Sequence, residues 1–190
     1  TNQANLDLSG LADFKLDANN VLLGRIGDNA TKSASMILAG VNKIEADTLT
    51  VGESASGSLT SLRLGPAANQ LWVNTLNIGT GGRDSGSITF NGPTGSIELR
   101  NRSGLATGRA NFNMQTGGAG TGYNTENVFD VAGHNANLMI GTLSVGGQPR
   151  IGFAINTINF DTGILDATGI RLGQRSGATT TVNAHTSTLN

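Results

Sequence analysis

The chain has 190 residues and a net charge of −1; only 13% of its residues are charged, 4% are aromatic and none is cysteine. This composition excludes disulfides and thiolate metal sites, and the balanced charge gives no electrostatic basis for binding nucleic acid or an anionic membrane. Gly, Thr, Asn and Ser together supply 85 residues, which favours short strands joined by tight turns over charged helices. The hydrophobic residues (37%) alternate with polar ones, which argues against disorder. No segment approaches the ~20 apolar residues of a membrane span, so we expect no membrane insertion.

A nine-residue motif recurs along the chain, with the pattern apolar, x, apolar or Ala, x, Thr, apolar, x, apolar, Gly. Its copies are "IEADTLTVG" (Ile44–Gly52), "LWVNTLNIG" (Leu71–Gly79), "LMIGTLSVG" (Leu138–Gly146) and the shorter "FAINTINF" (Phe153–Phe160). A looser copy, "LDATGIRLG" (Leu165–Gly173), is interpreted as carrying one glycine inserted after its Thr. Such internal repetition is typical of solenoids.

The phase inside the motif predicts a bend. Leu71 and Val73 share one face of a strand, because side chains alternate with period two. Leu76 and Ile78 also share a face, but their parity is shifted by one residue. A straight strand would bury only one of the two pairs, so Thr75 is predicted to lie at a bend or bulge that returns both pairs to the interior. A helix fails this test because the spacing is not 3.6 and Thr, Val, Ile and Gly are poor helix formers.

The spacing between copies predicts the length of a coil. Thr48 and Thr75 are 27 residues apart, which suits one solenoid coil. The 67-residue step from Thr75 to Thr142 fits two coils and an insertion of 13 residues, for which the Gly-rich segment Gln115–Asn127 is the expected lateral loop. The step from Thr142 to Thr157 is only 15 residues, so this copy is expected to serve a different side of the coil. The fold expected from these spacings is an irregular all-β solenoid that forms one domain over residues 1–190.

Stacked coils bury a continuous apolar core that no single coil could bury alone. The coils lie ~4.8 Å apart, the spacing of paired strands. Aligned side chains then lie directly above one another. Asn74 and Asn77, echoed by Asn156 and Asn159, are therefore predicted to form amide ladders between coils.

Segments such as "GSITFNGPTGSIELRNRSG" (Gly86–Gly104) and "NTLNIG" (Asn74–Gly79) resemble the β-strand repeats of large bacterial secreted proteins, namely autotransporter passengers and filamentous-haemagglutinin-like adhesins. The resemblance implies a right-handed parallel β-solenoid (β-helix) that lies outside the cell or on its surface.

The preferred functional hypothesis is a non-enzymatic extracellular structural protein, a subunit or segment of a surface fibre, sheath or stalk. The end segments "NLDLSGLADFKLD" and "TTTVNAHTSTLN" show no capping helix. Either this chain is a piece of a longer one or its subunits stack end to end, and the expectation is head-to-tail self-association into a homopolymer. One alternative is a glycan- or surface-binding adhesin that uses Trp72 and Tyr123 as exposed contact residues. Trp72 stands at an outward x position, but packing beneath the long Gly-rich loop (Gln115–Asn127) explains it equally well. A polysaccharide-active β-helix enzyme is the third hypothesis.

No catalytic, cofactor or metal site is predicted. "FDTG" (Phe160–Gly163) and "DATG" (Asp166–Gly169) resemble the aspartic-protease loop, but that chemistry needs two carboxylates from separate lobes that share one proton. The two strings lie only five residues apart, within consecutive repeat strands, and an Asp-x-Gly turn is also an ordinary way to close a strand. "GTGGRDSG" (Gly79–Gly86) resembles a Ca²⁺-binding repeat and is interpreted as a solvated turn, with calcium left open. His134 and His185 are expected at the surface.

Arg100, Arg102 and Arg109 form the one basic cluster in the sequence. A groove for nucleic acid would need interleaved aromatic side chains. We therefore interpret the cluster as a solvated edge or as a salt bridge to Glu98.

Overall fold

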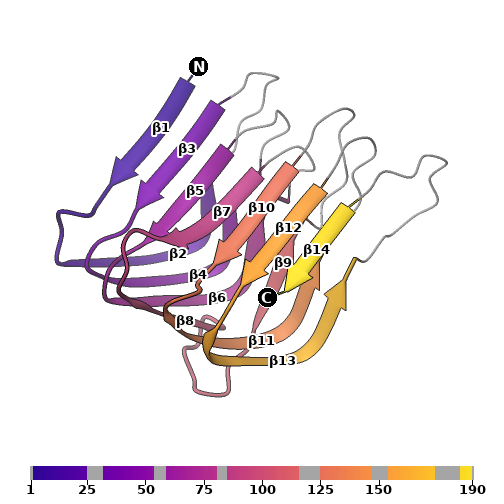
Figure 1. The fold of residues 1–190 in the computed structure, drawn as a ribbon. Coiled ribbons are helices and arrows are strands. Elements are labelled where there is room, and N and C mark those ends of the chain that lie inside the picture. The colour runs from indigo at the N-terminus through magenta and orange to yellow at the C-terminus, as the bar shows by residue number, and fades with distance from the viewer. Residues whose placement is uncertain are drawn as a thin grey trace.

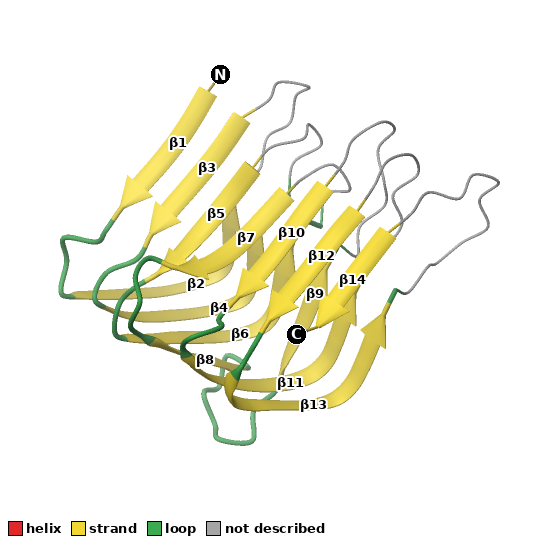
Figure 2. Cartoon of the chain, viewed as in Figure 1, coloured by secondary structure: helices red, strands yellow, loops and turns green. Residues whose placement is uncertain are grey.

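The computed structural model describes residues 2–24, 32–53, 59–80, 85–115, 125–146, 154–173 and 185–189, and every regular element in them is a β-strand (Figure 2). The strands are β1 (Asn2–Asp7), β2 (Asp13–Leu23), β3 (Lys32–Ile37), β4 (Val41–Val51), β5 (Leu59–Leu64), β6 (Ala68–Ile78), β7 (Ser85–Phe90), β8 (Ser96–Arg100), β9 (Ala110–Met114), β10 (Thr125–Asp130), β11 (Asn135–Val145), β12 (Ala154–Asn159), β13 (Thr162–Leu172) and β14 (His185–Leu189).

The strands form two parallel sheets that the chain visits in turn. The first sheet has the order β1-β3-β5-β7-β10-β12-β14, and the second has the order β13-β11-β8-β6-β4-β2, with β9 paired to β6 and β11. In the regular coils, side chains that hydrogen-bond between neighbours lie 27 or 28 residues apart in sequence, as in Asn42–Asn69 and Gln70–Glu98. Figure 1 shows the resulting stack, with β1 at one end and β13 and β14 at the other. The predicted all-β parallel solenoid is confirmed.

The second sheet is bent, because its 11-residue strands curve midway (Figure 1). In β6, Leu71 and Val73 are buried before the bend, and Leu76 and Ile78 are buried after it. Thr75 pairs with Thr48 of β4, as the 27-residue spacing predicts. The phase shift at Thr75 is therefore a real bend. It divides the second sheet into two parts that face the same core: a first leg, which precedes the bend and contains Leu71 and Val73, and a second leg, which follows it and contains Leu76 and Ile78.

Two copies of the motif correct the sequence interpretation. Leu165 pairs with Leu138, and Gly169 pairs with Thr142, so the last copy aligns without an inserted glycine. Gly169 simply replaces the Thr at the bend. Residues 154–159 of the Phe153–Phe160 copy form β12 in the first sheet, which confirms that this copy serves another side. Ile155, an apolar motif position before the Thr, is 45% exposed and does not face the core. β12 therefore has no bend of the kind seen at Thr75.

The core is built from columns of aligned side chains. In the first sheet one fully enclosed column runs through five coils: Met36, Leu62, Ile88, Phe129 and Ile158. The same column continues to Leu6 at one end and Leu189 at the other, where exposure rises to 50% and 36%. Each buried aliphatic side chain contributes ~1.5–3 kcal/mol, so stability comes from stacking coils and falls off at both ends.

The predicted amide ladders form in part. Amide pairs join neighbouring coils from Asn113 to Asn77 (3.0 Å), from Asn127 to Asn156 (2.9 Å) and from Asn42 to Asn69 (2.8 Å). Asn74 donates instead to the carboxylate of Asp47 at 3.1 Å. The Asn42–Asn69 pair was not predicted, and both residues are buried.

The two-coil step between Thr75 and Thr142 is confirmed by the coil that lies between them. Thr75 pairs with Asn111 of β9, and Leu143 of β11 pairs with Phe112. Part of the additional chain lies in the loop of residues 101–109, which separates β8 from β9 where other coils have one continuous strand. Of the predicted lateral loop 115–127, residues 116–124 lie outside the described part of the chain, and the prediction is wrong for residues 125–127, which belong to β10.

Candidate functional sites on the solenoid surface

The loop of residues 101–109, here called the clamp loop, covers the outer face of the first leg of the second sheet. The backbone of Gly104 packs directly against the indole ring of Trp72. A Cβ at this position would lie 2.4 Å from the ring, and the φ of Gly104 is +66°. On the same face, Lys43 Nζ lies 4.0 Å from the centroid of the Trp72 ring, a cation–π contact. Trp72 is thus half-buried under a glycine-containing loop. Its role as a contact residue stays a prediction, and Tyr123 lies outside the described residues.

One arginine of the clamp loop reaches coils near the N-terminal end. The guanidinium of Arg102 forms ion pairs with Asp17 (2.7 Å) and Asp47 (3.0 Å). Its backbone N–H donates to Asn74 Oδ1 at 3.2 Å. Hydrogen bonds to Asp47 and then Asp17 raise the pKa of Arg102. Counted from the N-terminus, the first three coils are β1 with β2, β3 with β4 and β5 with β6, and the fourth consists of β7, β8, the clamp loop and β9. The fourth coil is therefore tied to each of the three coils before it.

A second arginine reaches the opposite way. Arg109 donates to the carboxylate of Asp166 at 2.6 Å and to its backbone carbonyl at 2.8 Å. This hydrogen bond lowers the pKa of Asp166. Arg100 pairs with Glu98 on its own strand, which confirms the predicted salt bridge. The basic cluster is thus largely neutralised by carboxylates of this chain.

The aspartates of "FDTG" and "DATG", Asp161 and Asp166, have separate partners, and Asp166 lies within β13. Both oxygens of Asp161 accept the backbone N–H of Gly133 at 2.9 Å, whereas Asp166 pairs with Arg109. The two carboxylates therefore do not form the shared-proton pair that aspartic proteases need.

The expectation for His134 is wrong. Its ring stacks on Phe90 with centroids 3.6 Å apart, and it is only 9% exposed. An imidazole has a flat, largely apolar face, so it can pack like a small aromatic ring. The side chain of His185 lies outside the described part.

Within the described ranges, no group of three His, Cys, Asp or Glu residues is placed to hold a metal ion. The same ranges contain no helix with the length and apolar character of a membrane span.

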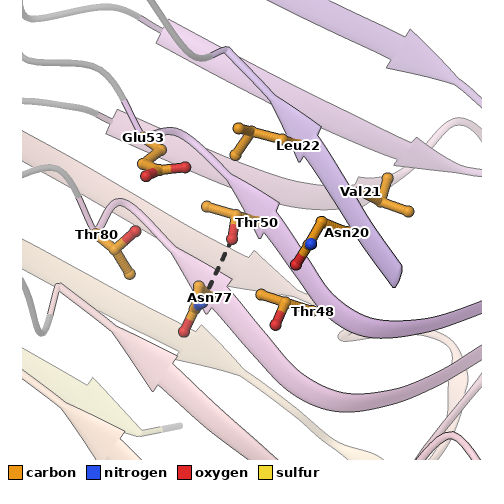
Figure 3. Close-up of a pocket in the computed structure, with 8 residues that line it drawn as sticks. All are labelled: Asn20, Val21, Leu22, Thr48, Thr50, Glu53, Asn77 and Thr80. Atoms are coloured by element: carbon orange, nitrogen blue, oxygen red, sulfur yellow. Dashed lines mark hydrogen bonds between the residues drawn. The ribbon is translucent and has the colours of Figure 1, made fainter. Parts of the chain in front are cut away.

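A polar groove of about 410 Å³ lies on the second leg of the second sheet, near the N-terminal end (Figure 3). It is lined by Asn20, Val21, Leu22, Thr48, Thr50, Glu53, Asn77 and Thr80. Asn77 Nδ2 donates to Thr50 Oγ1 at 3.3 Å, the dashed line in Figure 3, and Asn77 Oδ1 accepts from Asn113. These contacts fix the orientation of the Asn77 amide.

The groove presents mainly neutral hydroxyl and amide groups, with Glu53 as the one carboxylate in its lining. Each of these groups can donate or accept hydrogen bonds, except the ionised carboxylate, which only accepts. Such groups can exchange hydrogen bonds with the hydroxyl groups of a sugar. The groove is not predicted from the sequence, although the aligned Thr48, Thr50 and Asn77 of successive motif copies are a signal for it.

Neither a family model, nor a curated protein, nor a solved structure matches this chain. The fold and the surface geometry are therefore the basis for the functional proposals that follow.

Proposed function

We propose that this chain is a non-enzymatic structural protein of the cell surface, a segment or subunit of a fibre, sheath or stalk that extends by end-to-end stacking of solenoid coils. One observation carries the proposal: the apolar core columns are open at both ends of the described stack. Ile170 and Leu172 of β13 are 48% and 47% exposed, whereas Leu143 and Val145, their partners on β11, are 0% exposed. A further coil would enclose them and remove their apolar surface from water.

The open strands add a second driving force. The outer edges of β2 and β13 present backbone N–H and C=O groups to which another strand can pair. A contact between two different ends is heterologous, and repeated contacts of this kind form open filaments. The resemblance of the repeats to secreted surface proteins supports the extracellular location.

Electron microscopy and sedimentation of the purified chain test the assembly. We expect filaments at micromolar concentration, and we expect Leu172→Asp to abolish them because it places a charge in the open core column. Leu105→Asp is the matched control, since Leu105 is 65% exposed on the clamp loop, away from the end faces. Dispersed monomers at every concentration would refute end-to-end stacking.

Protease treatment of intact cells that produce the chain tests the location. Digestion without lysis supports a position on the outer surface. Protection that is lost only on lysis would contradict it.

The polar groove favours a second candidate, a glycan-binding adhesin. A glycan array tests it with the wild-type chain and with Asn77→Ala, which removes an amide from the groove lining. Asn111→Ala is a matched control, because Asn111 is an exposed asparagine on β9 that does not line the groove. A sugar bound by wild type and control but lost in Asn77→Ala supports the adhesin, and equal binding by all three assigns recognition to another surface.

A further inference from the structure

The polar groove belongs to a column of polar side chains that follows the stack axis. One motif position, two residues after the bend, faces outward on the second leg because side chains alternate along a strand. In successive coils it holds Thr50, Asn77, Asn113 and Ser144, which are register partners from β4 through β6 and β9 to β11. These four residues are here called the polar track. Thr50 and Asn77 line the groove, so the track extends it by two coils.

The track repeats at the spacing of paired strands. Neighbouring members lie ~4.8 Å apart, so the four residues span ~14 Å along the stack. Hydrogen bonds orient part of the row: Asn113 donates to Asn77 at 3.0 Å, and Asn77 donates to Thr50 at 3.3 Å, the bond drawn in Figure 3. Because an amide nitrogen has two N–H groups, each of these asparagines keeps one for a ligand. The track is thus a row of oriented donors and acceptors with one regular repeat.

Most of the track is accessible from outside. Thr50 is only 5% exposed and lies at the floor of the groove, whereas Asn77, Asn113 and Ser144 are half-buried. Leu22 of β2, which pairs with Thr50, is also half-buried and lines the same groove. Its side chain offers a small apolar surface against which the C–H groups of a sugar ring can pack.

The four members of the track carry no charge. Glu53 is the one carboxylate in the groove lining, and Arg171, the partner of Ser144 on β13, follows the last member. An acidic polymer would need a row of cations, but the arginines of the basic cluster lie at or beside the clamp loop, where carboxylates hold them. A row of neutral donors and acceptors instead matches a neutral polymer that is rich in hydroxyl groups.

The repeat sets the direction and the linkage of that polymer. An extended glycan with β-1,4 linkages advances by one sugar over a distance close to the strand spacing, so successive sugars can meet successive members of the track. A glycan that crosses the coils would instead meet only the few outward residues between the bend and the glycine after the strand, Gly79 in the case of β6. An α-1,4-linked glycan curves into a helix and cannot follow a straight row.

We infer that the polar track binds a neutral, extended β-1,4-linked glycan parallel to the stack axis, with one sugar to each coil. The inference rests on the glycan-binding candidate proposed above and gives its ligand a shape and a direction. It also makes the length of the glycan a determinant of affinity, because each added sugar reaches another coil until the track ends.

Titration calorimetry with two series of glucose oligomers tests the direction. The cello-oligosaccharides are β-1,4-linked and extended, whereas the malto-oligosaccharides consist of the same sugar with α-1,4 linkages. We expect the affinity to rise with each unit from cellobiose to cellotetraose, by at least tenfold in total, and to level off with longer oligomers. We expect maltotetraose to bind at least tenfold more weakly than cellotetraose.

The variant Ser144→Ala separates the track from the groove, because Ser144 belongs to the track but does not line the groove. We expect this variant to bind cellotetraose at least threefold more weakly than wild type and to bind cellobiose within twofold of wild type. Thr157→Ala is the matched control, since it removes a half-buried hydroxyl from β12 of the first sheet, and it should change neither affinity.

The axial arrangement is refuted if the β-1,4-linked series does not bind, if its affinity is independent of length, if the α-linked series binds equally well, or if Ser144→Ala leaves the affinity for cellotetraose unchanged. The glycan-binding candidate then still stands if the glycan array shows a sugar whose binding requires Asn77. Binding of no glycan, either in the array or in the titrations, would overturn that candidate and this inference together.

Discussion

Asn127 is a buried amide whose loss the structure predicts to be costly. It is fully buried, and its Oδ1 accepts the backbone N–H of Gly86 at 2.9 Å. Its Nδ2 donates to Gln115 at 2.6 Å and to Asn156 at 2.9 Å. Asn127→Ala therefore leaves one buried donor and two buried acceptors without this partner.

Each buried group that loses its partner costs ~1–3 kcal/mol. A water molecule that enters the vacated volume restores some of these bonds, because three polar groups face it. We therefore expect Asn127→Ala to lower the free energy of unfolding by about 3 kcal/mol. With a urea m-value of ~2–3 kcal/mol/M, the midpoint should fall by ~1–1.5 M.

Urea titration followed by circular dichroism measures this shift, and hydrogen exchange at Gly86 reports the lost bond directly. Asn111→Ala is the control, because Asn111 is an exposed asparagine on β9, and surface substitutions stay within ~0.5 kcal/mol. If Asn127→Ala and Asn111→Ala had the same midpoint, or if the Gly86 amide kept its protection, the assignment of stability to this buried amide would be refuted.

Gly65→Ala should destabilise the chain by ~1–3 kcal/mol, because its Cβ would lie 1.7 Å from the carbonyl oxygen of Ala39; Gly92→Ala, with no atom within 4 Å, should be near neutral in the same thermal melts. Asp166 has a lowered pKa because Arg109 donates a hydrogen bond to it, so its stabilisation is present above the ordinary aspartate pKa and is lost as pH falls through the lowered value. Asp166→Asn should therefore flatten the decline of the urea midpoint below about pH 4, and an unchanged slope would contradict this.

The bend and the coil length could be predicted from sequence because both follow from local backbone geometry. The pairs Leu71/Val73 and Leu76/Ile78 have opposite parity, and a bend is the simple way to bury both. Thr168 in the last motif copy resembles the Thr that marks the bend in the other copies, but Gly169 occupies the bend position. The identity of one residue is therefore a weaker guide to alignment than the apolar spacing. The spacing of Leu165, Ala167, Ile170 and Leu172 alone would have placed Gly169 at the bend.

The clamp loop and the packing of His134 could not be predicted in the same way. Arg102 and Asp17 are 85 residues apart, and no periodicity links them, since their contact depends on how far a loop and a long side chain extend across coils. His134, between β10 and β11, stacks on Phe90 at the end of β7, and a lone histidine carries no sequence signal of that partner. The polar groove, in contrast, could be predicted from the sequence, because its Thr and Asn residues recur at fixed motif positions.

The clamp loop changes how the stack should come apart. In a simple solenoid each coil contacts only its neighbours, so terminal coils fray one at a time. Here Arg102 links the fourth coil to Asp17 in the first, and Arg109 links it to Asp166 in the last full coil. Fraying at either end must break a contact held by the middle of the array. We therefore expect each end to unfold together with the fourth coil. Unfolding of the array should be cooperative over several coils and not only between neighbours.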